Sequence, residues 1–149
     1  MANGDPLPSL FALLRATIGD ILVHGTSFLD LCADDILFEF PYARADGVHR
    51  LEGKEALAAY LPGVGKMVRI DRLVPTTVHR TSDSEVVILE FFAEGSGVAT
   101  GIPYDQRYIS VIRVRDGLIV HYKDYWNPLV AIRAAGGDAG MREALGSQS

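Results

Sequence analysis

The carboxyl group of Asp124 is the side chain in this sequence best suited to acid–base chemistry. It lies in the segment 118–128, which follows the hairpin-forming pair Asp116–Gly117. Alternate residues of a strand share a face, and the predicted face of Asp124 is otherwise apolar or aromatic: Leu118, Val120, Tyr122 and Trp126. Burial there would disfavour the charged carboxylate and raise its pKa toward neutrality, as a general acid or base requires. Alternatively, Asp124 pairs with an arginine or accepts hydrogen bonds from a neighbouring loop.

Hydroxyl and imidazole groups elsewhere could assist this carboxyl. Tyr104 and Tyr108 fall on one face of the predicted strand 104–115, and their hydroxyls could donate hydrogen bonds to a substrate oxygen. In the alternative reading their rings belong to the core and their hydroxyls reach the surface. His49 lies in a predicted loop that could cover the mouth of a pocket, although a lone loop histidine is more often solvated.

Aromatic and apolar side chains from separate segments could form the walls of such a pocket. Period-two spacing places three aromatic residues on one side of the first predicted strand and its end. The residues expected to contact a substrate are Trp126, Tyr122, Phe38, Phe40, Tyr42 and Leu14.

Motifs for metal ions or organic cofactors are missing from the sequence. The four histidines have no metal-ligand spacing, and there is no HExxH motif, glycine-rich phosphate loop or GxSxG elbow. We therefore expect neither a metal nor a cofactor.

Composition points to one folded domain spanning residues 1–149. The 149 residues are 48% hydrophobic and 22% charged, and the net charge of −5 argues against a nucleic-acid surface. The lone cysteine, Cys32, lies in an apolar run and is expected to be a small core residue. No apolar segment is long enough to cross a membrane, and the N-terminus lacks the pattern of a signal peptide. We expect a cytoplasmic protein.

Helices precede most of the strands. Apolar residues spaced three and four apart predict a first helix from Asp5 to about Leu22, ended by Gly25, and a short helix follows through Cys32. Further helices are predicted over 52–61, closed by Pro62, and from Pro128 to 135, with Asn127 as the cap of the latter. A frayed tail is expected over about 137–149. Strands are predicted over 36–40, 68–81, 85–93, 104–115 and 118–127, with a loop over 42–52. This order predicts an α+β fold in which a curved antiparallel sheet wraps around N-terminal helices and encloses a hydrophobic pocket.

Three segments in this order resemble the SnoaL-like branch of the nuclear-transport-factor-two-like (ketosteroid-isomerase-like) superfamily over about residues 7–135. They are Phe38–Tyr42, Leu51–Leu57 and Arg115–Leu129, and the last also resembles the phenazine-biosynthesis A/B proteins. The resemblance implies a cone-shaped, cystatin-like barrel with a deep hydrophobic pocket, a homodimer formed through the outer sheet face, and a role in secondary metabolism. It also implies a cofactor-independent polyketide cyclase, isomerase, dehydratase or epoxide hydrolase. Asp124 matches the acidic residue that serves as acid or base on the last strand in this branch.

Differences from three related types of enzyme reduce the number of reactions that the resemblance implies. Phe40 stands where ketosteroid isomerases carry their general base, so steroid isomerisation by that route is not expected. Two residues beyond Arg107, Ile109 replaces the acid of limonene-type epoxide hydrolases, and the histidine pair of scytalone-type dehydratases has no clear match.

Three functional hypotheses follow. In the first, the protein is an enzyme in which Asp124 moves a proton on a small hydrophobic carbonyl-bearing ring compound. In the second, the same pocket binds a small hydrophobic ligand without turnover, as a binding module or accessory subunit. In the third, the pocket is empty and the protein has only a structural role.

Overall fold

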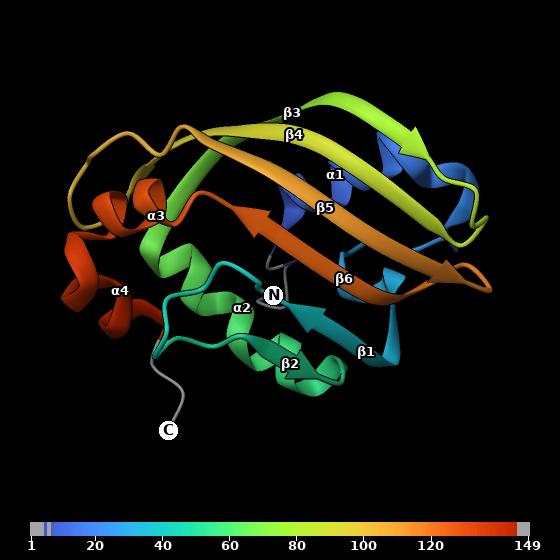
Figure 1. Ribbon diagram of the computed structural model, residues 1–149, viewed down its shortest axis with the longest axis horizontal. Coiled ribbons are helices and arrows are strands. Elements are labelled where there is room, and N and C mark those ends of the chain that lie inside the picture. The colour runs from blue at the N-terminus through green and yellow to red at the C-terminus, as the bar shows by residue number, and fades with distance from the viewer. Residues whose placement is uncertain (1–4, 6, 146–149) are drawn as a thin grey trace.

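The computed structural model describes residue 5 and residues 7–145, and it shows helices covering one face of a curved, unclosed sheet (Figure 1). The six strands are β1 (Cys32–Glu39), β2 (Arg50–Glu52), β3 (Val68–Arg80), β4 (Val86–Gly97), β5 (Gln106–Arg115) and β6 (Leu118–Trp126). They lie in the order β2-β1-β6-β5-β4-β3. The predicted α+β class is confirmed, although β1 and β6 pair in parallel and the sheet is therefore mixed. The predicted loop over 42–52 contains β2, which pairs with β1.

The first helix, α1 (Pro8–Ile18), is shorter than predicted and continues as the 3₁₀ turn η1 (Gly19–Ile21). Asp5 lies before it and accepts hydrogen bonds from the backbone N–H groups of Leu7 at 2.9 Å and Phe28 at 3.1 Å. A second 3₁₀ turn, η2 (Leu29–Leu31), replaces the predicted short helix. The buried face of α1 carries Leu10, Leu13, Leu14 and Ile18.

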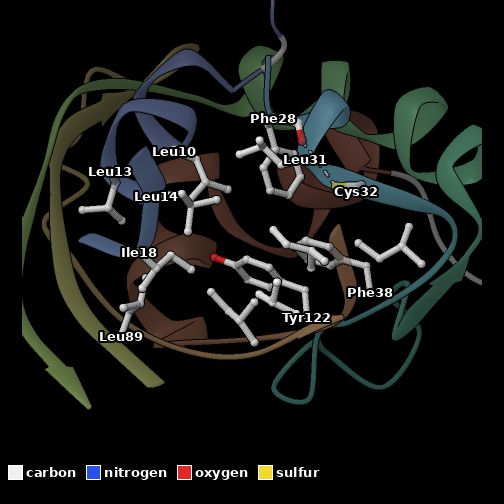
Figure 2. Packing of buried hydrophobic residues seen from close by; sticks show 14 of the residues in the cluster. Leu10, Leu13, Leu14, Ile18, Phe28, Leu31, Cys32, Phe38, Leu89 and Tyr122 are labelled. Atoms are coloured by element: carbon white, nitrogen blue, oxygen red, sulfur yellow. Dashed lines mark hydrogen bonds between the residues drawn. The ribbon is translucent and has the colours of Figure 1, made fainter. Parts of the chain in front are cut away.

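The main core lies between α1 and the concave face of the sheet (Figure 2). The ring of Tyr122 stacks on Phe38 with centroids 4.6 Å apart, and Phe28 meets both rings edge-on. Cys32 is 1% exposed, its Sγ–H donates to the carbonyl of Phe28, and burial raises the pKa of its thiol to about 12. The prediction that Cys32 is a core residue is confirmed.

The second helix, α2 (Lys54–Met67), runs through Pro62, where the sequence predicted its end. A proline inside a helix removes one hydrogen bond and costs about 3 kcal/mol. Beyond this point the helix places Met67 in a buried position, and Leu61 just before it is also buried. Burying a side chain such as Met67 stabilises the fold by roughly 1.5–3 kcal/mol, which is comparable to the cost of the proline.

The hairpin between β5 and β6 turns at Asp116 and Gly117, whose φ angles of 54° and 83° confirm the predicted two-residue turn. Its register shifts between Arg113 and Val114, so that Ile119 is completely buried while Val120 is only half-buried. The assignment of Leu118 and Val120 to the face of Asp124 was therefore wrong, because a bulge inserts one residue and reverses the alternation before it.

Two helices follow β6 in the described part of the chain. The Asn127 side chain accepts a hydrogen bond from the Leu129 N–H at 3.0 Å and caps α3 (Pro128–Ala135) as predicted. The expected frayed tail is wrong for 137–145, which form α4 (Gly137–Leu145), and residues 146–149 lie outside the described part. Helix α4 packs on α2, buries Met141, and holds Asp46 through Arg142 at 2.6 Å. No helix among the described residues has the length and apolar character needed to cross a membrane.

Candidate active site

A cavity of about 490 Å³ lies between the concave sheet face and the helices α1 and α2. Its sheet-side wall includes Phe38, Phe91, Tyr108, Tyr122 and Asp124, and Phe40 follows directly on β1. Leu10 from α1 and Leu61 from α2 face this wall. The cavity is thus mostly apolar and aromatic, with one carboxyl group on its sheet-side wall.

Asp124 lies directly opposite Ser110 in the β5–β6 ladder. Within the described residues, no hydrogen-bond donor or cation contacts its side chain. Part of its surface is accessible, but Asp124 lines the cavity, so this part faces the cavity interior. Removal from water is the cause that raises the pKa of Asp124 to about 7. A carboxyl with this pKa exchanges protons readily near neutral pH.

Tyr108 also lines the cavity, one diagonal step from Asp124 across the ladder. Its hydroxyl is hydrogen-bonded to the Tyr104 hydroxyl at 2.7 Å. Burial raises the pKa of Tyr104 to about 12 and that of Tyr108 well above its usual value, and the nearby Asp124 adds to both shifts. Both phenols are therefore neutral hydrogen-bond donors at physiological pH. Only Tyr108 lines the cavity, whereas Tyr104 is 3% exposed and lies behind it.

Tyr122 lies two residues before Asp124 on β6 and presents its ring to the cavity. Its hydroxyl is paired with that of Ser110 at 2.8 Å, and both residues are almost completely buried. The pair satisfies two buried hydroxyls without involving the carboxyl of Asp124.

Five of the predicted site residues do not line the cavity, and Tyr104, which lies behind Tyr108, is the first of them. Trp126 borders two other hollows, and Tyr42 is 56% exposed because the chain turns away at Pro41 and sets its ring against Tyr125. Leu14 is buried in the core one turn beyond Leu10, the α1 residue that does line the cavity.

The loop that carries His49 does not cover the cavity mouth either. The backbone carbonyl of His49 accepts a hydrogen bond from the Phe40 N–H at 2.8 Å, which ties this loop to the end of β1. No residue from 41 to 53 lines the cavity, so the structure does not place His49 beside Asp124.

Sequence reasoning missed the contribution of α2. Tyr60 packs against Phe40 with ring centroids 5.3 Å apart, and burial together with the charge of Asp124 raises its pKa to about 12. Leu61, Val64 and Gly65 line the cavity from the same helix. The spacing of Leu57, Tyr60, Leu61 and Val64 could have indicated this face, but ending the helix at Pro62 hid it.

The part of the chain that the structure describes contains no group of three or more His, Cys, Asp or Glu side chains placed to hold a metal ion. Beside Asp124, the polar groups that line the cavity from β5 and β6 are the neutral hydroxyls of Tyr108 and Tyr122, and this set suits proton transfer.

Comparison with known proteins agrees with this architecture. Residues 13–122 match the model of the SnoaL-like domain. The uncharacterized protein YesE of Bacillus subtilis is 44% identical over 120 residues, which are 80% of this chain and 82% of YesE. An uncharacterized PhzA/B-like protein of Pseudomonas aeruginosa is 35% identical over 127 residues, covering 79% of this chain and 89% of that protein.

Solved structures show the same fold. A Bacillus subtilis protein described as a candidate isomerase is 46% identical and superposes with a TM-score of 0.71, covering 74% of this chain and 80% of that one. An NTF2-like protein from Burkholderia xenovorans is 25% identical with a TM-score of 0.59, covering 87% of this chain and 92% of that one. The predicted resemblance is confirmed: this chain belongs to the SnoaL-like domain family and has the NTF2-like, ketosteroid-isomerase-like fold.

Proposed function

We propose that this protein is a cofactor-independent acid–base enzyme of the isomerase, cyclase or dehydratase type, acting on a small hydrophobic ring compound that carries a carbonyl group. The observation that carries this proposal is Asp124, a carboxyl without a partner among the described residues, on the sheet-side wall of an apolar cavity. The candidate isomerase from Bacillus subtilis, which shares 46% of its sequence, supports the same class of reaction.

The reaction begins when the apolar cavity binds the ring with its carbonyl toward Tyr108. The Asp124 carboxylate takes a proton from the carbon next to the carbonyl, and negative charge develops on the carbonyl oxygen. The Tyr108 hydroxyl donates a hydrogen bond to that oxygen, and Tyr104 holds Tyr108 in place. Asp124, now a neutral acid, returns the proton to another carbon or gives it to a leaving oxygen. With a pKa of about 7, it reaches both protonation states near neutral pH.

A non-catalytic binding module is the alternative that uses the same cavity. The two functions make opposite predictions for Asp124→Asn, which keeps the shape of the side chain and removes its acid–base capacity. Asp105→Asn is the matched control, because Asp105 is exposed and does not line the cavity.

The experiment follows exchange of the α-hydrogens of ring ketones in heavy water by proton NMR. We expect the wild-type protein and Asp105→Asn to accelerate exchange, and Asp124→Asn to lose about 10²–10⁴-fold of that rate. Calorimetric titration should show that the ketone still binds Asp124→Asn. Ketone binding without acceleration by the wild type would instead assign the protein as a binding module.

We also propose that the protein forms a homodimer through the outer face of the sheet. Ile109 on β5 is 45% exposed there, and Val111 on the same face of β5 is half-buried, which leaves apolar surface for a second copy. Light scattering should give the mass of a dimer for the wild type and a smaller mass for Ile109→Glu. A monomeric wild type would contradict this proposal. A cytoplasmic location remains a prediction.

A further inference from the structure

Two glycines in the last turns of α2 differ in what surrounds them. A Cβ at Gly63 would lie 2.7 Å from the backbone oxygen of Ala144, so the close packing of α4 requires a glycine there. A Cβ at Gly65 would meet nothing within 4 Å, and the backbone of Gly65 is not left-handed. Glycine is among the least favourable residues inside a helix. Neither close packing nor backbone conformation explains why position 65 is a glycine.

Gly65 lies at the mouth of the cavity. Four lining residues are exposed, which marks the side where the cavity opens to solvent: Pro8, Gly65, Arg69 and Val98. Val98 is 56% exposed, although it is apolar. A side chain at position 65 would therefore enter open space. The Val98 N–H donates to the Met67 carbonyl at 2.9 Å, which holds this exposed apolar residue near the same end of α2.

We propose that Gly65 is a specificity-determining position, which keeps the entrance wide enough for an elongated ligand. The reacting ring lies against Asp124, and an apolar extension of the same molecule passes Gly65 and contacts Val98. This inference rests on the proposed function and adds a substrate class to it: a ring ketone that carries a second apolar group, in place of a single small ring. The exposed side chain of Val98 then becomes covered when ligand binds.

The test compares two probes, cyclohexanone and the longer 4-cyclohexylcyclohexanone, by calorimetric titration against wild type, Gly65→Ala and Gly65→Leu. Lys66→Leu is the control, because Lys66 is the exposed neighbour that does not line the cavity. We expect Gly65→Leu to weaken binding of the longer ketone about tenfold or more, and that of cyclohexanone by less than about twofold. Gly65→Ala should have a smaller effect in the same direction, and Lys66→Leu none.

Thermal unfolding of each variant confirms that it is folded, and Gly65→Ala decides the question if Gly65→Leu does not fold. The inference about Gly65 is overturned if the wild type binds both ketones and the position-65 variants bind the longer one equally well. If the wild type binds neither ketone, the proposed substrate class fails, and the inference about Gly65 fails with it.

Discussion

Asp124 and Ser110 face each other across β5 and β6, and the small side chain of Ser110 leaves the carboxyl open to the cavity. The Ser110 hydroxyl is bonded to Tyr122 instead. The Ser110 hydroxyl therefore does not stabilise the carboxylate of Asp124. Among the described residues, no hydrogen bond or ion pair compensates this carboxylate for its loss of water. This arrangement is the structural cause of its raised pKa.

Direct titration should show this effect. With the carboxyl carbons labelled, the NMR signal of Asp124, assigned through Asp124→Asn, should titrate with a midpoint near 7, far above the ordinary 3.8. A midpoint at or below 4 would mean that the carboxylate is solvated or paired, and Asp124 could then not serve as an acid at neutral pH.

The raised pKa of Asp124 also makes the free energy of unfolding depend on pH. The folded chain keeps the Asp124 proton up to about pH 7, whereas the unfolded chain releases it near 3.8. The resulting stabilisation is fully present below pH 3.8 and is lost as pH rises to about 7. The difference of about three units between the unfolded and folded pKa values of Asp124 corresponds to about 4 kcal/mol in the free energy of unfolding. The free energy of unfolding of wild type minus that of Asp124→Asn should fall by up to this amount between pH 4 and 8.

Urea unfolding at several pH values measures this difference. The carboxylates of Glu85 and Glu94, whose pKa values are lowered by arginine partners, are present in both proteins and cancel. A difference that does not change with pH would contradict the burial of an uncompensated acid at position 124.

Removing the Tyr108 hydroxyl should slow the reaction more than it weakens binding. Tyr108→Phe takes away the donor that faces the cavity, and loss of one such donor typically costs about 10²–10³-fold in kcat. Tyr104→Phe should cost less, because its hydroxyl acts through Tyr108 at 2.7 Å. Steady-state ketone exchange by both variants measures the two effects. Equal losses from both variants would show that Tyr104 also contacts the substrate.

The fold could be predicted from sequence where periodicity dominates. The apolar stripe of the first helix, the Asp116–Gly117 turn and the Asn127 cap are local signals, and each is found in the structure. The bulge before His121 could not be predicted, since it depends on how β5 and β6 pair. The continuation of α2 through Pro62 was missed because tertiary burial outweighs a local penalty.

The candidate site also contains residues whose place could be predicted from the sequence and residues whose place could not. Asp124, Tyr108, Tyr122, Phe38 and Phe40 share the cavity because strand alternation fixes which face they occupy. Trp126, Tyr42, Leu14 and His49 do not line it, since strand ends, helix rotation and loop paths are set by packing across the molecule. The α2 wall is likewise a product of tertiary structure.

The buried hydroxyl pair should behave as one unit. Ser110→Ala leaves the Tyr122 hydroxyl without its partner and should cost about 1–3 kcal/mol in the free energy of unfolding. Tyr122→Phe should be costly for the same reason, whereas the double variant should cost less than the sum. Urea unfolding of the four proteins gives the coupling, and strictly additive costs would show that the 2.8 Å contact does not stabilise the fold.

The composition of α2 also affects how a molecule reaches Asp124. Pro62, Gly63 and Gly65 make its second half the segment least able to remain helical alone, and this segment borders the cavity mouth. Local unfolding favours such segments, so the amide hydrogens of residues 63–67 should exchange with solvent faster than those of α1. Entry and exit of a ligand would then follow brief fraying of a helix end, with the sheet that holds the acid left undisturbed.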